Sequence, residues 1–187
     1  MSRRSVSISM VLAFFLFLPA VAAEHKSGLG AAVAGGVADC GNCFDATTFS
    51  GFALFGKIGI TRNWGVLITY RDMEQEDDDL FSLFFNEKDT HTQLAVQGVY
   101  MWRPSKTVRP HIKLGLERTD FERKVPGFPA VSDDGTGWSL GGGFEAGNQR
   151  VAFFLDYDIT RVKLDIGGSN NEDFTFANLN AGIIFKL

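Results

Sequence analysis

Beyond its first 23 residues, the sequence has no hydrophobic run that approaches the ~20 apolar residues of a membrane-spanning helix. This part of the chain also lacks the 3.6-residue periodicity of an amphipathic helix, and its apolar and polar residues alternate instead. Together, the two absences exclude a helical membrane protein and indicate an all-β chain.

The chain also has no excess of basic residues over acidic ones. The 187 residues include 18 Lys and Arg against 22 Asp and Glu, which gives a formal net charge of −4. Arg3 and Arg4 are the only charged residues before residue 24, so the rest of the chain is more acidic than the whole. This argues against nucleic acid as a partner, because nucleic-acid-binding domains carry clustered positive charge.

The first 23 residues predict a secretory signal peptide. Arg3 and Arg4 form a basic start, residues 10–19 form a short apolar core, and the small residues 21–23 offer a cleavage site after Ala23. An N-terminal membrane anchor is the alternative, but the apolar run is short for one and the cleavage site follows at once. We therefore expect a signal peptide over 1–23 and a single domain over 24–187.

Cysteine is scarce, with only Cys40 and Cys43 in the motif DCGNCFD. An exported chain meets an oxidising compartment, which favours a small structural disulfide between these two residues. A redox-active or metal-binding CxxC is the alternative, but no second cysteine pair or paired histidines accompany it. We expect no metal site and no cofactor.

Eight segments of the mature chain show the two-residue alternation of β-strands. They are residues 27–38, 50–60, 64–75, 90–102, 109–121, 136–146, 151–164 and 174–187. The connections between them are alternately short, as in TRN (61–63) and GNQ (147–149), and long and mostly polar. This pattern predicts an antiparallel up-and-down barrel with one plain end and one end that carries longer loops.

Each segment has an apolar face, and its opposite face mixes small and charged residues. Trp64, Tyr100 and Trp102 lie on the apolar face near the short connections, and Trp138 and Tyr157 lie on it toward the long ones. Aromatic residues at the borders of an apolar band are typical of a transmembrane barrel whose apolar side faces lipid. A soluble barrel with an apolar interior, as in lipocalins, is the alternative.

The transmembrane arrangement explains two aspartates, Asp156 and Asp158, that interrupt the apolar run RVAFFLDYDIT. They would face the narrow interior of an eight-stranded barrel, where charged groups must pair with one another or recruit water. We predict an interior ion-pair network, with Lys186 as a further candidate cation. Its members are Lys57, Arg71, Lys113, Glu117, Glu145, Asp156 and Asp158.

Several segments resemble the small outer-membrane β-barrels of Gram-negative bacteria, of the OmpA transmembrane-domain and OmpX/Ail type. They are VRPHIKLGLE (108–117), GWSLGGGFEAG (137–147), VAFFLDYDIT (151–160) and FANLNAGIIFKL (176–187). The resemblance implies an outer-membrane location, a monomer, and roles in envelope integrity, surface adhesion or limited permeation. Such barrels usually end in an aromatic residue; here the last residue is Leu187, and Phe185 lies two positions earlier on the same face.

The loops are the candidate sites of interaction with a host or surface ligand. The connection at 76–89 carries an acidic run, Asp77, Asp78 and Asp79, which we interpret as a solvated loop rather than a divalent-cation site. The same connection carries an apolar cluster, which is either an interaction patch or the packed end of a hairpin. Its aromatic members are Phe81, Phe84 and Phe85.

Three outward-facing cations, Arg118, Arg161 and Lys163, lie near the long-loop end and are candidate contacts for lipopolysaccharide phosphates. Two other functions compete with an envelope or adhesion role. A narrow solute pore is disfavoured because an eight-stranded lumen is normally filled. A lipid A-modifying enzyme is disfavoured because neither His91 nor His111 has a nearby serine and acid in a catalytic arrangement.

Overall fold

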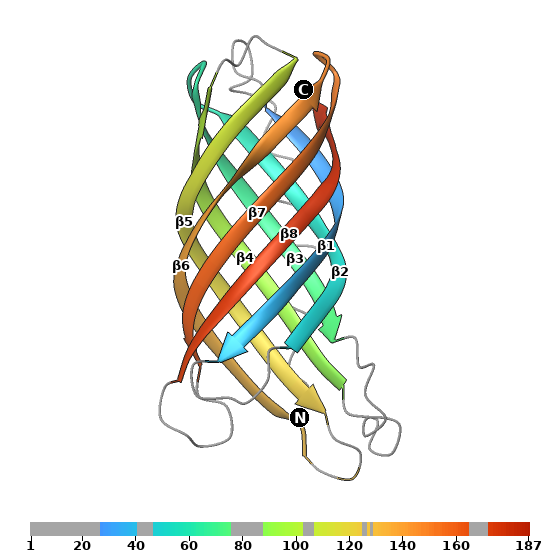
Figure 1. The fold of residues 1–187 in the computed structure, drawn as a ribbon, viewed down its shortest axis with the longest axis vertical. Coiled ribbons are helices and arrows are strands. Elements are labelled where there is room, and N and C mark those ends of the chain that lie inside the picture. Colours follow the sequence, from blue (N-terminus) through green and yellow to red (C-terminus); the bar gives the residue numbers. More distant parts are fainter. Residues whose placement is uncertain are drawn as a thin grey trace.

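The computed structural model describes residues 27–40, 47–75, 88–102, 107–124, 127, 129–164 and 172–187. These residues form eight antiparallel strands in one closed barrel, in which each strand pairs with its neighbours in sequence (Figure 1). The strands are β1 (Gly28–Cys40), β2 (Thr47–Gly59), β3 (Trp64–Gln75), β4 (Lys88–Met101), β5 (Val108–Lys124), β6 (Val131–Gly147), β7 (Val151–Leu164) and β8 (Glu172–Lys186). All eight predicted strands are confirmed. The described residues contain no helix that could cross a membrane.

The first and last strands close the barrel. β1 pairs with β8 from Gly28 opposite Lys186 to Cys40 opposite Phe174. In the body of the barrel, closure pairs every described strand on both sides. The backbone N–H and C=O groups there bond one another, because a lipid environment could not satisfy them.

The two faces of the wall differ as the alternation predicts. In β7, odd-numbered residues such as Phe153 and Tyr157 point outward, and even-numbered ones, Asp156 and Asp158 among them, are buried in the lumen. Large apolar side chains cover the outside, and Leu116 is 64% exposed there. The lipocalin-like alternative is therefore wrong.

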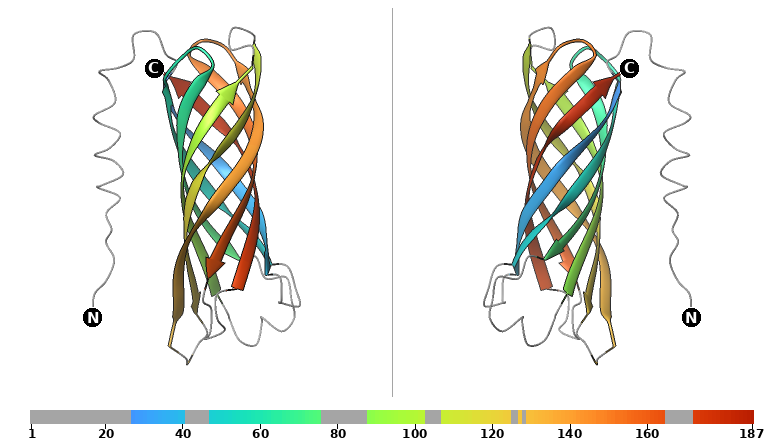
Figure 2. Two further views of the ribbon diagram at one scale, coloured as in Figure 1. Left: turned by 90° about the vertical axis from the view of Figure 1, so that its left-hand side faces the viewer. Right: turned by 90° about the vertical axis from the view of Figure 1, so that its right-hand side faces the viewer.

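The two ends of the barrel are unequal. The C-terminus lies at the end with the short connections, which is the upper end in Figure 1. At this end Trp64, Tyr100 and Trp102 form a chain of ring contacts on the outer face, with centroids 4.9 and 5.2 Å apart. In barrels of this type, short turns face the periplasm and longer loops face the exterior. At the long-loop end the β5–β6 hairpin extends past the neighbouring strands (Figure 2).

Candidate functional site in the barrel lumen and at its rim

The lumen makes room for the two aspartates on β7 with glycines on β6. Asp156 lies opposite Gly143 and Asp158 opposite Gly141. A Cβ atom on Gly143 would lie 2.5 Å from Asp156 Oδ1 and 2.0 Å from the Leu155 carbonyl oxygen. Side chains at these two positions would therefore occupy the space of the carboxylates.

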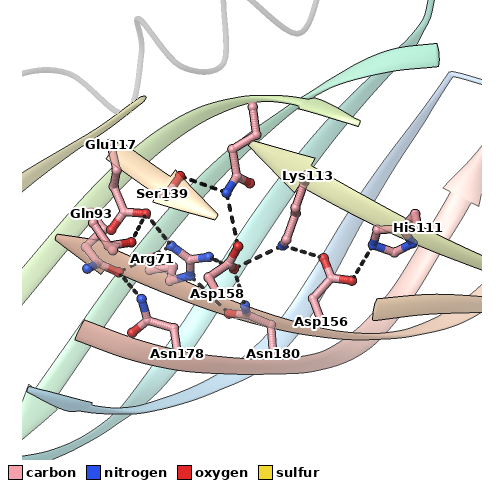
Figure 3. A network of polar contacts seen from close by, with 12 residues as sticks. Arg71, Gln93, His111, Lys113, Glu117, Ser139, Asp156, Asp158, Asn178 and Asn180 are labelled. Atoms are coloured by element: carbon pink, nitrogen blue, oxygen red, sulfur yellow. Dashed lines mark hydrogen bonds and ion pairs between the residues drawn. The ribbon is translucent and has the colours of Figure 1, made fainter. Parts of the chain in front are cut away.

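A central network connects these carboxylates to side chains from five other strands (Figure 3). Its main cation is Arg71, which is fully buried. The Arg71 guanidinium donates to Asp158, to Glu117 at 3.2 Å and to Asn180 at 3.1 Å. Thr160 also donates a hydrogen bond of 2.9 Å to Glu117. Every nitrogen of this guanidinium therefore has an acceptor.

Lys113 continues the network toward the short-turn end. Its ammonium donates to Asp156 at 2.8 Å and to Asp158 at 3.0 Å. His111 Nε2 lies 2.8 Å from the other oxygen of Asp156. Gln97 donates to Asp158 at 3.0 Å. The five predicted residues of this network, namely Arg71, Lys113, Glu117, Asp156 and Asp158, are thus brought together.

The other two predicted network residues form a separate group near the short-turn end, here called the periplasmic cluster. It consists of Glu145 and three cations: Lys57, which bonds Glu145 directly, Arg109 at 3.2 Å and Lys186 at 3.9 Å. Sequence reasoning missed Arg109. Its position in the alternation, two residues before the inward-facing His111, could have identified it.

An apolar layer lies between the two polar groups, and side chains of both groups reach the cavity beside it. Phe55 and Phe154 meet edge to face with centroids 4.5 Å apart, inside the barrel rather than on its lipid face. A cavity of about 20 Å³ lies beside them and is also lined by Lys57 and His111. This volume holds about one water molecule.

A second apolar layer fills the lumen toward the long-loop end. His91 stacks on Phe176 at a centroid distance of 4.3 Å and contacts Phe49 at 5.3 Å. Met73 and Phe121 are also buried, and they lie directly opposite His91 on the two neighbouring strands. Neither ring nitrogen of His91 has a hydrogen-bond partner among the described residues. We call the five residues the aromatic plug; the predicted polar interior did not include it.

The three predicted lipopolysaccharide contacts all point outward at the long-loop end. Arg118 forms ion pairs with Asp134 at 3.0 Å and Asp120 at 3.6 Å, and Arg161 pairs with Asp173 at 3.3 Å. Lys163 is exposed on β7. The rim is therefore a mixed belt of both charges, in which two of the three cations already have carboxylate partners.

Some predicted sites lie outside the described residues. These are Cys43 and the loop residues Asp77, Asp78, Asp79, Phe81, Phe84 and Phe85. Cys40 ends β1, and the disulfide stays a prediction.

The chain matches a known protein family. The family model described as "Outer membrane protein beta-barrel domain" matches residues 8–185. No curated protein matches the chain.

Solved structures with similar folds are distant in sequence. Ail, the attachment invasion locus protein of Yersinia pestis, is 14% identical, with a TM-score of 0.62 over 88% of this chain and 99% of that one. Neisserial surface protein A is 11% identical, with a TM-score of 0.67 over 86% and 97%. OprG of Pseudomonas aeruginosa is 14% identical, with a TM-score of 0.58 over 88% and 98%. Ail is also known in complex with the heparin analogue sucrose octasulfate.

Proposed function

Because the chain belongs to the outer membrane protein β-barrel domain family, we propose that it is a non-conducting barrel that strengthens the envelope and presents surface contacts on its extracellular loops. The bacterial outer membrane is its location. The observation that carries the proposal is the filled lumen. Polar clusters and apolar layers alternate along it, so a solute would have to displace several buried groups at once.

The central network makes this displacement unfavourable. Both partners of the Arg71–Glu117 and Arg71–Asp158 pairs are completely buried. A buried charge that loses its partner destabilises a protein by about 3–5 kcal/mol. An open path through the centre would separate several such pairs, whereas the closed state satisfies them.

Conductance across planar lipid bilayers tests the filled lumen. We expect no current steps from the wild-type barrel, nor from Asp156→Asn or Lys113→Met, because the aromatic plug still closes the lumen in both variants. Reproducible steps from pure wild-type protein would support the pore alternative instead. Arg118→Met, at the exposed rim, is the matched control for a lost cation.

Envelope strengthening would act through the rim. Arg118, Arg161 and Lys163 would contact phosphates of lipopolysaccharide, with the neighbouring carboxylates holding the side chains in position. The test compares a deletion strain that carries the wild-type gene with one that carries the triple Gln variant, in which Arg118, Arg161 and Lys163 are all replaced by Gln. We expect the triple variant to restore less resistance to detergent and EDTA at equal amounts of folded barrel. Equal resistance would contradict the rim contacts.

Adhesion to an anionic polysaccharide is a second candidate, because the same cations lie at the long-loop end. Ail binds a heparin analogue. Binding of immobilised heparin by whole cells that carry wild type or the triple Gln variant would test it. A salt-sensitive loss in the variant would support adhesion, and equal binding would contradict a role for these cations.

Lipid A modification is the competing enzyme function. Mass spectrometry of lipid A from cells with and without the protein tests it. We expect identical profiles, and a new lipid A species that requires the protein would overturn the non-enzymatic assignment.

A further inference from the structure

The periplasmic cluster contains more positive than negative charge. Lys57, Arg109 and Lys186 all approach one carboxylate, that of Glu145. Their side chains are at most 11% exposed, so water does little to screen the excess. The central network differs, because its carboxylates outnumber its cations.

Arg109 also has unused hydrogen-bond donors. Its Nε and Nη2 atoms have no hydrogen-bond partner among the described residues, although the residue is only 2% exposed. Nη2 lies 3.2 Å from Glu145 Oε2, but this oxygen accepts no hydrogen bond either. Arg71, in contrast, uses every nitrogen.

Nε and Nη2 form one edge of the guanidinium plane, with two nearly parallel N–H bonds. This edge matches two oxygens of a carboxylate or phosphate, and such bidentate bonds are among the strongest in proteins. A buried donor without an acceptor destabilises the fold by about 1–3 kcal/mol, and by more when it is charged. An additional hydrogen-bond acceptor would therefore stabilise this site, and the net positive charge of the cluster favours an anion over water in that position.

We propose that the periplasmic cluster is a binding site for a small oxyanion of the phosphate class, which enters from the periplasmic end. Arg109 would bind two of its oxygens, and Lys57 and Lys186 would supply further positive charge. Lys186 already donates to the Asn148 carbonyl at 3.0 Å, which holds its ammonium beside the turn between β6 and β7. Glu145 would limit the affinity, because its carboxylate lies beside the same guanidinium edge.

Titration with inorganic phosphate tests the site. The full mature chain would be folded in an uncharged alkyl maltoside, which contains no phosphate group. The readouts would be the Nε resonance of Arg109 in a ¹⁵N-arginine NMR spectrum and the unfolding midpoint in urea. We expect saturable changes in both with phosphate, and none with chloride at equal ionic strength.

Three variants make the test specific. Arg109→Lys keeps the charge but loses the planar edge, and we expect at least about tenfold weaker binding, or about 1.4 kcal/mol. Glu145→Gln removes the competing carboxylate, and we expect tighter binding although the unliganded barrel becomes less stable. Arg123→Lys, on the same strand at the opposite end, is the control that should bind as wild type does, because Arg123 pairs with Asp89 at 2.7 Å, far from the periplasmic cluster.

The direction in which Glu145→Gln changes the phosphate affinity distinguishes ligand binding from a purely structural role. If Glu145 served only to neutralise the cations, its loss would change stability without tightening phosphate binding. No saturable response in wild type, an equal response to chloride, or unchanged binding in Arg109→Lys would overturn the proposal and leave water as the occupant of the edge. None of these outcomes bears on the non-conducting function, which concerns the rest of the lumen.

Discussion

Arg71 and Lys113 carry the positive charge at the centre of the lumen, and their partners come from strands far apart in the sequence. Lys113 is held between two aspartates that are themselves two residues apart on β7. Because both carboxylates point inward at neighbouring positions, each would repel the other without the ammonium between them. Lys113 therefore allows both aspartates to stay charged.

Lys113→Met should destabilise the barrel by about 3–5 kcal/mol, since it leaves two buried carboxylates without their shared cation. The double variant Lys113→Met/Asp156→Asn should recover part of this loss, because one unpaired charge is removed. Urea unfolding in lipid vesicles, followed by tryptophan fluorescence, measures both. Additive effects in the double variant would contradict the coupling. Arg118→Met, at an exposed pair, should cost about 1 kcal/mol or less.

Gly143→Ala tests the space beside Asp156. Its Cβ would lie 2.0 Å from the Leu155 carbonyl oxygen and 2.5 Å from Asp156 Oδ1, so backbone and carboxylate must both shift. We expect a loss of about 1–3 kcal/mol, the range for overpacked sites. Gly98→Ala is the matched control, because the nearest atom to its Cβ is the Leu114 carbonyl oxygen at 3.8 Å. Equal stability of the two variants would contradict the steric argument.

At the scale of the single strand, successive inward-facing residues lie at successive levels of the lumen. β7 contributes Phe154 to the apolar layer near the periplasmic end and Asp156 and Asp158 to the central network. β8 contributes Asn180 to the central network and Phe176 to the aromatic plug. The alternating polar and apolar levels follow from the order of inward-facing residues along each strand.

Phe176→Ala should remove a main contact of the aromatic plug and leave a cavity beside His91. Truncation of a buried phenylalanine costs about 3–5 kcal/mol, and Phe176 is 2% exposed. Phe176→Leu should recover much of this stability, because leucine fills most of the lost volume. Urea unfolding of the three proteins gives the comparison, and equal losses for Ala and Leu would contradict a packing role.

At the scale of the whole molecule, the closed hydrogen-bonded wall and the filled lumen support each other. Because the wall is closed, unfolding has to break the hydrogen-bond ladder and the interior contacts together. The barrel should therefore resist detergent as one unit. The lipid-facing exterior and the outer-membrane location account for the large apolar surface that a soluble protein would not expose.

This cooperativity predicts a shift in gel mobility. Outer-membrane fractions run with and without boiling before electrophoresis should show a compact unboiled band and a slower boiled one. The expected shift depends on the wall staying closed in dodecyl sulfate. A soluble periplasmic protein without a shift would contradict both the fold and the location.

The sequence alone determined the eight strands, their lipid-facing and interior faces, and the inward direction of the seven predicted network residues. These properties follow from a two-residue alternation that each strand expresses locally. The tertiary structure decided which inward residues meet: Arg71 and Asp158 are 87 positions apart, and Lys57 and Glu145 are 88 apart. It also separated the network into two clusters and placed phenylalanines between them and toward the long-loop end. Among the described residues, it left two donors of Arg109, Nε and Nη2, without a hydrogen-bond partner. Contacts across the lumen depend on how each tilted strand is staggered against its neighbours, and local alternation does not encode that stagger.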